Sequence, residues 1–271
     1  MATYPHTRRP IIGVTTKMYF SLAHTRSYIG QVLAILAEQR SILDRIDVFV
    51  CPDTLALPSV VSQAKTPGLP VLIGAQDCAA DDSGAFTGFV SPAVLAECGA
   101  RLVEVGHTER RRLLGETDTT TALKAAAAVR NGLIPIVCVG ESEPPAGVST
   151  EAELGASAEA AIATVSKQIS TVLDALPDDA EVVLAYEPVW AIGAAQPASA
   201  AYVRAVVSGM RDRCAAIQRR GAARTRIIYG GGAGPGMFAQ LEGTVDGLFL
   251  GRTGHDPEQF VKTAQEVADF C

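Results

Sequence analysis

Short apolar runs rich in β-branched residues alternate along the chain with longer stretches in which apolar residues recur at helical spacing. Eight runs have the length and composition of strands, at residues 10–16, 46–52, 69–76, 101–107, 134–140, 181–187, 225–230 and 245–251. Helical spacing is clearest at residues 23–40, 119–131, 151–176, 200–220 and 257–270. This regular alternation predicts a parallel sheet covered by helices.

The number of repeats selects between two architectures. Eight strand–helix units in about 250 residues predict a closed (β/α)8 barrel. The alternative, an open doubly wound sheet, usually carries a G-x-G-x-x-G turn after its first strand, whereas Thr15-Thr16-Lys17-Met18 stands there in this chain. The one linker-like stretch, residues 143–150, falls within the connection after the fifth strand. We therefore expect residues 1–271 to form a single domain.

Composition and charge narrow the class of partner. Hydrophobic residues make up 48% of the 271 positions and charged residues 19%, so the chain has enough apolar surface to fold. The 23 basic and 29 acidic residues give a formal net charge of −6, which argues against a general affinity for nucleic acid or for an anionic membrane. Any basic site must therefore be local.

The cysteines and the start of the chain bear on the cellular compartment. The six cysteines lie far apart and form no C-x-x-C pair; they are Cys51, Cys78, Cys98, Cys138, Cys214 and Cys271. They are typical of small core residues in a reducing compartment rather than of a disulfide framework or a metal site. No basic and apolar leader opens the sequence, and no apolar run approaches the ~18 residues of a membrane helix. We expect a cytoplasmic protein.

Candidate catalytic residues follow the predicted strands. In a barrel of this kind the carboxyl ends of the strands form the active site. Lys17 follows the first strand, His107 ends the fourth, Glu187 ends the sixth, and glycine-rich turns follow the seventh and eighth. Each residue alone also has a structural interpretation, because surface lysines and capped strand-end histidines are common. Their convergence on one mouth predicts an active site.

His107 opens the motif G-H-T-E-R-R. Gly106 permits a tight turn, and Thr108 is a candidate cap for a short helix whose first turn carries Glu109. The partial positive charge of a helix N-terminus disfavours an imidazolium. We therefore expect a neutral His107 that donates one hydrogen bond to a substrate oxygen, the alternative being a purely structural histidine.

Glu187 ends an apolar strand and precedes Pro188, which disfavours a helical conformation at Glu187. The carboxylate is thereby held at a strand end. The next residues, Val189-Trp190-Ala191-Ile192-Gly193, form a mostly apolar loop with the one tryptophan of the chain. An apolar loop is expected to pack over something, so we interpret residues 188–198 as a lid that excludes water and strengthens Glu187 as a base.

Backbone N–H groups are the candidate phosphate ligands. Residues 230–236 are rich in glycine and follow the seventh strand, and Gly251 follows the eighth. Barrels frequently bind phosphate at this pair of loops, because glycine lets the backbone approach an anion closely. A P-loop is excluded, since no G-K-[ST] triplet ends the turn.

Taken together, these motifs resemble the triosephosphate isomerase family along nearly the whole chain. The matching motifs, in the family's order, are Thr16-Lys17-Met18, Gly74-Ala75-Gln76, Gly84-Ala85-Phe86-Thr87-Gly88, Gly106-His107-Thr108-Glu109-Arg110-Arg111, Cys138-Val139-Gly140-Glu141, Ala185-Tyr186-Glu187-Pro188-Val189-Trp190-Ala191-Ile192-Gly193 and Tyr229-Gly230-Gly231. The resemblance implies the shift of an aldose to a ketose on a short sugar phosphate, with no cofactor and no metal. It assigns Glu187 as the base, His107 as the electrophile, Lys17 as the electrostatic stabiliser and Glu109 as a supporting carboxylate.

Four departures from the family pattern fall in the expected pocket. Thr15 stands where the family has Asn two residues before its Lys. The lid tip reads Gly193-Ala194-Ala195-Gln196 followed by Pro197, in place of Gly-Thr-Gly-Lys. Gly232 replaces a Ser that helps to latch the lid, and Gly251-Arg252 replaces Gly-Gly. The Arg252 side chain either pairs with the substrate phosphate or points outward with only its N–H engaged.

The departures are similar to a branch of the family that acts on four-carbon erythrulose phosphates. Because Thr15 leaves room for one more carbon, we favour L-erythrulose 1-phosphate as the substrate. The alternatives are the glycolytic triose phosphate reaction and a non-catalytic sugar-phosphate-binding barrel. The resemblance also implies a homodimer, in which the loop at residues 81–91 brings Thr87 to Thr15 and Glu109 of the neighbouring chain.

Overall fold

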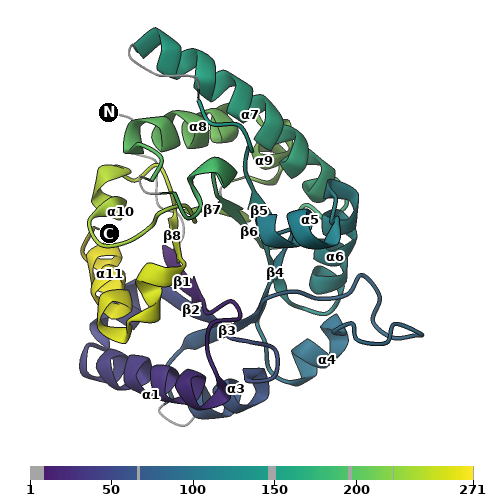
Figure 1. The fold of residues 1–271 in the computed structure, drawn as a ribbon, viewed down its shortest axis with the longest axis vertical. Coiled ribbons are helices and arrows are strands. Elements are labelled where there is room, and N and C mark those ends of the chain that lie inside the picture. Colours follow the sequence, from purple (N-terminus) through teal and green to yellow (C-terminus); the bar gives the residue numbers. More distant parts are fainter. Residues whose placement is uncertain (1–8, 66–67, 146–150, 195–196, 222, 271) are drawn as a thin grey trace.

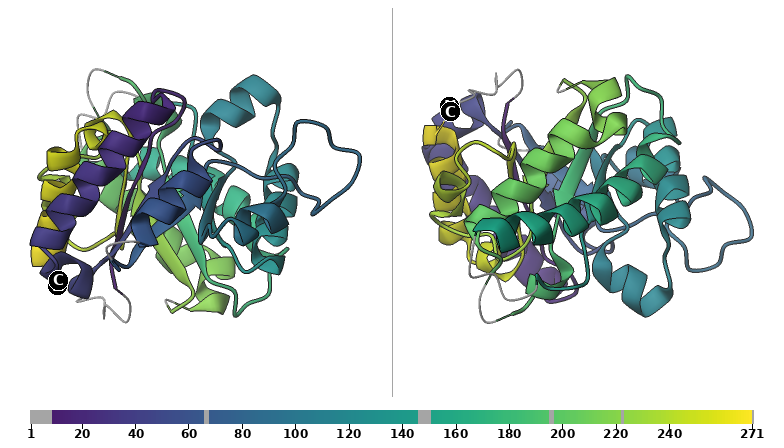
Figure 2. Two further views of the ribbon diagram at one scale, coloured as in Figure 1. Left: turned by 90° about the horizontal axis from the view of Figure 1, so that it is seen from below. Right: turned by 90° about the horizontal axis from the view of Figure 1, so that it is seen from above.

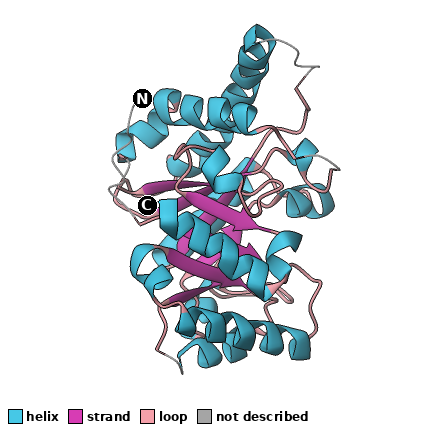
Figure 3. Ribbon diagram, turned by 90° about the vertical axis from the view of Figure 1, so that its left-hand side faces the viewer, coloured by secondary structure: helices cyan, strands magenta, loops and turns pink. Residues whose placement is uncertain are grey.

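The computed structural model describes residues 9–65, 68–145, 151–194, 197–221 and 223–270. Eight parallel strands close into a barrel with helices around its outside (Figures 1 and 3). The strands are β1 (Ile11–Thr15), β2 (Asp47–Cys51), β3 (Val71–Ala75), β4 (Leu102–Val105), β5 (Ile134–Val139), β6 (Val182–Tyr186), β7 (Thr225–Tyr229) and β8 (Gly247–Leu250). Each pairs with the next, and β1 pairs with β8 through Ile11 and Gly247. The predicted closed barrel is confirmed, and every strand lies within its predicted range.

The helices agree less closely with the expected ranges. They are α1 (Leu22–Glu38), α2 (Ser41–Arg45), α3 (Leu57–Lys65), α4 (Pro92–Glu97), α5 (Thr108–Leu114), α6 (Asp118–Arg130), α7 (Glu151–Leu173), α8 (Ala200–Arg213), α9 (Ala215–Arg220), α10 (Met237–Gln240) and α11 (Pro257–Phe270), with 3-10 turns η1 (Val189–Ala191) and η2 (Arg252–His255). The prediction of a single helix at 200–220 is wrong. Cys214 has an extended backbone with ψ of 102° and separates α8 from α9. Its thiol faces the core, so the apolar pattern continues across the break.

Side chains on the strands alternate between two apolar cores. One face of each strand packs against the helices, and the other fills the barrel, where the rings of Phe49 and Phe249 lie 5.3 Å apart. Gly13 makes room for Phe49, because a Cβ there would lie 2.1 Å from the ring. This packed interior leaves the carboxyl ends of the strands as the floor of a pocket.

A charged cluster closes the amino end of the barrel. Arg226 on β7 points inward and is almost fully buried. Its guanidinium lies 2.7 Å from Asp47 Oδ2 and 2.6 Å from Glu181 Oε1. This end is thereby sealed by side chains whose charges are paired.

The connection between β3 and α4 projects from the barrel as a long loop (Figure 2). Asp82 ties its base to α6 through Arg130 and Asn131, at 2.9 and 2.7 Å. Its tip exposes Phe86 and Phe89, whose rings meet edge to face at 6.2 Å.

Among the described residues, none of the helices combines the length and the apolar character that a membrane-spanning helix needs.

Candidate active site

A pocket of about 530 Å³ opens at the carboxyl ends of the strands. It brings together nine of the residues predicted from the sequence, which are Thr15, Lys17, His107, Glu109, Glu187, Gly193, Gly232, Gly251 and Arg252. Ala195 and Gln196 of the predicted lid tip lie outside the described residues. Among the described residues, no group of three or more His, Cys, Asp or Glu side chains is arranged to hold a metal ion.

Lys17 is held in an uncommon backbone conformation at the edge of the pocket. Its φ is 45°, in the left-handed region that side chains other than glycine rarely adopt. The Lys17 N–H donates to Thr15 Oγ1 at 3.3 Å, and Gln76 Nε2 donates to the Lys17 carbonyl at 3.0 Å. These contacts aim the ammonium into the pocket, where Nζ lies 2.8 Å from Glu109 Oε1.

The charges around Lys17 keep it protonated. Burial by itself lowers the pKa of Lys17, but the hydrogen bond and the negative charge of Glu109, with smaller contributions from Glu187 and Glu104, raise it above its ordinary value. Partial burial in turn raises the pKa of Glu109, and the contact with Lys17 outweighs this effect and lowers it. Lys17 therefore stays protonated in the pocket, with its charge balanced on one side by Glu109.

His107 caps the helix that follows it. The expected cap, Thr108, is instead the first residue of α5, and Nδ1 of His107 accepts the backbone N–H of Glu109 at 3.2 Å. A ring nitrogen that accepts this bond carries no proton, so the hydrogen-bond network assigns the remaining proton to Nε2. Nε2 lies 3.4 Å from Lys17 Nζ and 3.5 Å from Glu187 Oε2. The Nε2 edge of His107 is thus turned toward the pocket.

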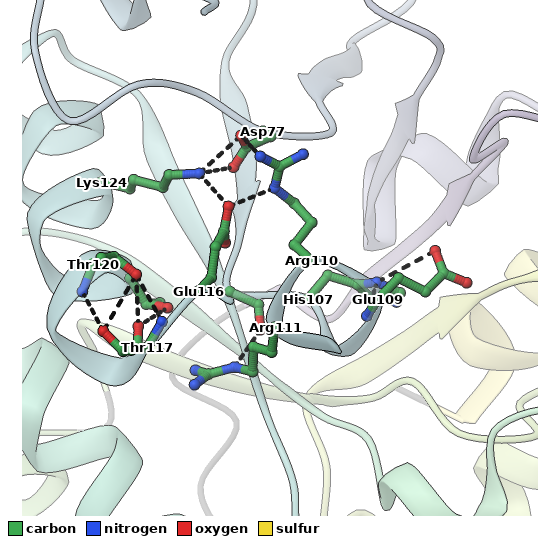
Figure 4. Close-up of polar contacts among 11 residues, drawn as sticks. Asp77, His107, Glu109, Arg110, Arg111, Glu116, Thr117, Thr120 and Lys124 are labelled. Atoms are coloured by element: carbon green, nitrogen blue, oxygen red, sulfur yellow. Dashed lines mark hydrogen bonds and ion pairs between the residues drawn. The ribbon is translucent and has the colours of Figure 1, made fainter. Parts of the chain in front are cut away.

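A charged network beside the pocket holds α5 in place (Figure 4). Arg110 of α5 lies 2.7 Å from both Asp77 Oδ2 and Glu116 Oε1. Lys124 of α6 contacts the same two carboxylates at 2.7 and 2.5 Å. Because two cations share two carboxylates, the helix that His107 caps is tied to both β3 and α6.

Two glycines fit closely around Glu187. A Cβ on Gly230 would lie 2.3 Å from Glu187 Oε1, and a Cβ on Gly140 would lie 1.9 Å from the Glu187 carbonyl oxygen. Only glycine at these positions leaves Glu187 where it is. Its Oε2 is buried and accepts no hydrogen bond from the described residues. The carboxylate is therefore available to a ligand proton.

The first part of the predicted lid is anchored by Glu141. This buried carboxylate accepts hydrogen bonds from Trp190 Nε1 at 2.8 Å, from Tyr202 at 3.0 Å and from Tyr186 at 3.2 Å. The apolar lid residues therefore pack around a buried polar anchor. Glu141 stands in one of the motifs noted above, but no role could be predicted for it, because its three partners lie 45 to 61 residues further along the chain.

The part of the pocket lined by Gly232, Gly251 and Arg252 combines glycine backbone with a cationic side chain. Pro197 packs against Gly232, where a Cβ would lie 2.6 Å from the proline Cβ. The serine that the family carries at position 232 would therefore clash with Pro197, so the two departures fit each other. Arg252 begins η2 and lines the pocket with no ion-pair partner among the described residues.

The structure also places residues at the site that the sequence analysis did not select. Arg112 of α5 lines the pocket. Glu104 of β4 lies inside the barrel, where its carboxyl interacts electrostatically with His107, Glu187 and Lys17. The one available signal was an acidic residue among the apolar residues at 102–105.

Comparison with known proteins agrees with this geometry. The sequence model of the triosephosphate isomerase family matches residues 10–267. The L-erythrulose-1-phosphate isomerase of Pectobacterium atrosepticum is 43% identical over 258 residues, which cover 93% of each chain. The triosephosphate isomerase of Moorella thermoacetica is 36% identical over 257 residues, 93% of this chain and 96% of its own. The L-erythrulose-1-phosphate isomerase of Mesorhizobium japonicum is also 36% identical, over 92% and 94%.

The family match covers nearly the whole chain, and the relatives align over more than nine-tenths of their own lengths. The barrel and the pocket at its carboxyl end lie within the matched residues. The relatives named above are sugar-phosphate isomerases. This chain therefore belongs to the triosephosphate isomerase family, and it is an enzyme of the sugar-phosphate isomerase type.

Proposed function

We propose that this enzyme moves the carbonyl group of a short sugar phosphate to the neighbouring carbon through an enediol, without a cofactor, as in an aldose–ketose isomerisation. Its favoured substrate is L-erythrulose 1-phosphate, in which C1 carries the phosphate and the carbonyl moves from C2 to C3. The observation that carries the chemistry is the position of His107 Nε2, 3.4 Å from Lys17 Nζ and 3.5 Å from Glu187 Oε2. A base, a neutral donor and a fixed cation thus surround one small volume of the pocket. This is the set of groups that an enediol intermediate requires.

Each group has a separate step. Glu187 removes a proton from the carbon beside the carbonyl, using the buried oxygen that accepts no hydrogen bond. The Nε2–H of His107 donates to the oxygen that gains negative charge and moves a proton between the two oxygens of the enediol. Lys17 stabilises the same negative charge, and Glu109 orients Lys17 through the 2.8 Å contact. Glu187 then returns the proton to the neighbouring carbon.

The phosphate is proposed to bind at the opposite end of the pocket. The backbone at Gly193, Gly232 and Gly251 lines that end, and the Arg252 guanidinium adds a charge-assisted contact. Residues 188–198 act as the lid over the bound substrate. Binding energy from the phosphate is thereby used for the chemistry at the carbon end.

The choice of substrate rests on Thr15 and on the relatives. Thr15 is shorter than the family's Asn and lines the carbon end of the pocket. The Pectobacterium relative, at 43% identity, is named as an L-erythrulose-1-phosphate isomerase. The proposal is tested by measuring kcat/KM on L-erythrulose 1-phosphate and on glyceraldehyde 3-phosphate. A ratio of about 10 to 200 in favour of the four-carbon substrate is expected for one carbon of discrimination.

The second candidate is the glycolytic reaction between glyceraldehyde 3-phosphate and dihydroxyacetone phosphate. The triosephosphate isomerase of Moorella thermoacetica, at 36% identity, favours it. A wild-type enzyme faster on the triose phosphate would establish this alternative. A non-catalytic sugar-phosphate-binding barrel would bind both compounds without turnover, and the intact Glu187 argues against it.

We further propose that the enzyme is a cytoplasmic homodimer. Phe89, at the tip of the projecting loop, is 66% exposed, and Met18, beside the pocket, is 90% exposed. Exposed apolar groups of this kind are stabilised by a second copy that covers them, and Thr87 of the loop would approach Thr15 and Glu109 of the partner. Sedimentation at micromolar concentration is expected to give twice the 28.3 kDa of one chain. A mass of one chain would contradict the dimer.

A further inference from the structure

Glu104 is a buried carboxyl group for which the proposed reaction has no use. It follows Leu102 by two residues on β4, and Leu102 belongs to the apolar cluster inside the barrel. The Glu104 side chain therefore points into the barrel, and the residue is 3% exposed. Its one side-chain partner among the described residues is the Cys138 thiol, with Sγ 3.6 Å from Oε1. No cation forms an ion pair with Glu104 in the described part of the chain.

The groups that face Glu104 come from several strand ends. His107 follows β4 itself, Glu187 follows β6, and Lys17 follows β1; all three interact electrostatically with the Glu104 carboxyl. The thiols of Cys138 on β5 and Cys51 on β2 are the remaining titratable neighbours, and burial raises the pKa of both well above the usual range. Glu104 and Glu187 are thus two carboxyl groups in one water-poor volume, in which like charges repel strongly.

We propose that Glu104 is a positioning residue that acts through Glu187 and His107. As a neutral carboxylic acid it adds no negative charge to those of Glu187 and of Glu109, which Lys17 pairs, and its ionisation weakens the binding of the anionic sugar phosphate. This inference rests on the proposed isomerase function. It assigns the neutral form of Glu104 to the active enzyme.

The electrostatics agree with this assignment. Burial, reinforced by the negative charge of Glu187 and opposed by the positive charge of Lys17, raises the pKa of Glu104 to about 7. A substrate phosphate dianion above the barrel adds a further negative charge and favours the neutral acid still more. By linkage, ionisation of Glu104 in the free enzyme must therefore oppose substrate binding. The effect is expected in kcat/KM, which reports the free enzyme, and at higher pH in kcat, which reports the complex.

The first test compares Glu104→Gln with the wild type over a range of pH. The amide has the shape of the neutral acid and does not ionise. Wild-type kcat/KM is expected to fall about tenfold between pH 6 and pH 8.5, and that of Glu104→Gln by less than about twofold over the same interval. An alkaline fall of equal size and midpoint in both proteins would overturn the proposal.

A second pair of variants tests the same point without removing the carboxyl group. Cys138→Ser provides a stronger hydrogen-bond donor to ionised Glu104, whereas Cys138→Ala provides none. The midpoint of the alkaline fall is expected to move to lower pH in Cys138→Ser and to higher pH in Cys138→Ala. A midpoint that stays fixed in both folded variants would contradict the role of Glu104, because a structural effect on packing would not move it in opposite directions.

An infrared pH titration provides a readout that needs no substrate. In the infrared difference spectrum of wild-type protein minus Glu104→Gln, a carboxylic C=O stretch is expected at pH 6. The same band is expected to disappear at alkaline pH. Absence of that band at pH 6 would overturn the proposal. Failure of the proposed isomerase function has a different signature, because it appears as wild-type protein that turns over neither sugar phosphate at any pH.

Discussion

The two ends of the barrel interior handle buried charge in opposite ways. At the amino end, the Arg226 guanidinium lies within 2.7 Å of Asp47 and 2.6 Å of Glu181. At the carboxyl end, Glu104 has a thiol as its side-chain partner, and the buried Oε2 of Glu187 accepts no hydrogen bond from the described residues. The same eight strands therefore carry a neutralised cluster at one end and carboxyl groups without a cation on them at the other.

The difference shows which end is arranged for stability and which for chemistry. A buried charge without a partner costs free energy, because desolvation is not offset by a favourable contact. At the amino end the contacts with two carboxylates offset that cost. At the carboxyl end the cost is not offset, because a reacting carboxylate must remain free to take a proton. Four predictions, given in order of decreasing effect, test this contrast.

Glu187→Ala tests the carboxyl end most directly. Loss of the base is expected to lower kcat by at least about 10³-fold, since general-base catalysis contributes roughly 10² to 10⁴. Steady-state kinetics measure the effect, and circular dichroism checks that the fold is intact. Glu187→Gln is the matched control for shape and is expected to be as inactive as Glu187→Ala. A near-normal kcat in either variant would remove Glu187 from this role.

Arg226→Ala breaks the paired end. It leaves the Glu181 carboxylate without its cation and leaves Asp47 to the more distant Arg9, at 3.4 Å, which is expected to lower the free energy of unfolding by about 3 kcal/mol. This value is at the low end for buried pairs, because both carboxylates are partly exposed. Denaturant unfolding at fixed protein concentration measures the loss. Arg226→Lys, which keeps the charge, should lose less, and a neutral effect of Arg226→Ala would show that the cluster does not stabilise the barrel.

Glu104→Gln is expected to act on stability in the opposite direction. Glu104 keeps its proton in the folded chain up to about pH 7, whereas its ordinary pKa is 4.5. The folded state therefore binds more protons between these values, and wild-type stability falls as the pH rises through this window. Relative to the wild type, Glu104→Gln should gain about 2 to 3 kcal/mol between pH 4.5 and pH 8. Parallel stability curves for the two proteins would contradict the raised pKa.

Thr15→Asn is expected to have the smallest effect, confined to substrate choice. The bulkier amide at the carbon end should shift the ratio of kcat/KM toward glyceraldehyde 3-phosphate by about tenfold. Arg252→Gly is the control at the phosphate end, where loss of the guanidinium should raise KM for both substrates and leave their ratio unchanged. An unchanged ratio in Thr15→Asn would show that Thr15 does not select the substrate.

The barrel and the central catalytic candidates could be predicted from the amino-acid sequence. Strand positions follow from short apolar runs, which are local patterns. Lys17, His107 and Glu187 could be found because each directly follows or ends such a run, and parallel strands bring their carboxyl ends to one mouth. The pocket contains all three.

The partners of the remaining charged side chains became visible only in the folded chain. Arg226 meets Asp47 from β2, and Glu141 meets Trp190 and Tyr202, across sequence separations that no local pattern encodes. The inward orientation of Glu104 likewise acquires meaning once closure of the barrel places it among the charges of other strand ends. The physical reason is that apolar burial is specified residue by residue, whereas the state of a buried charge depends on every group that the fold brings near it.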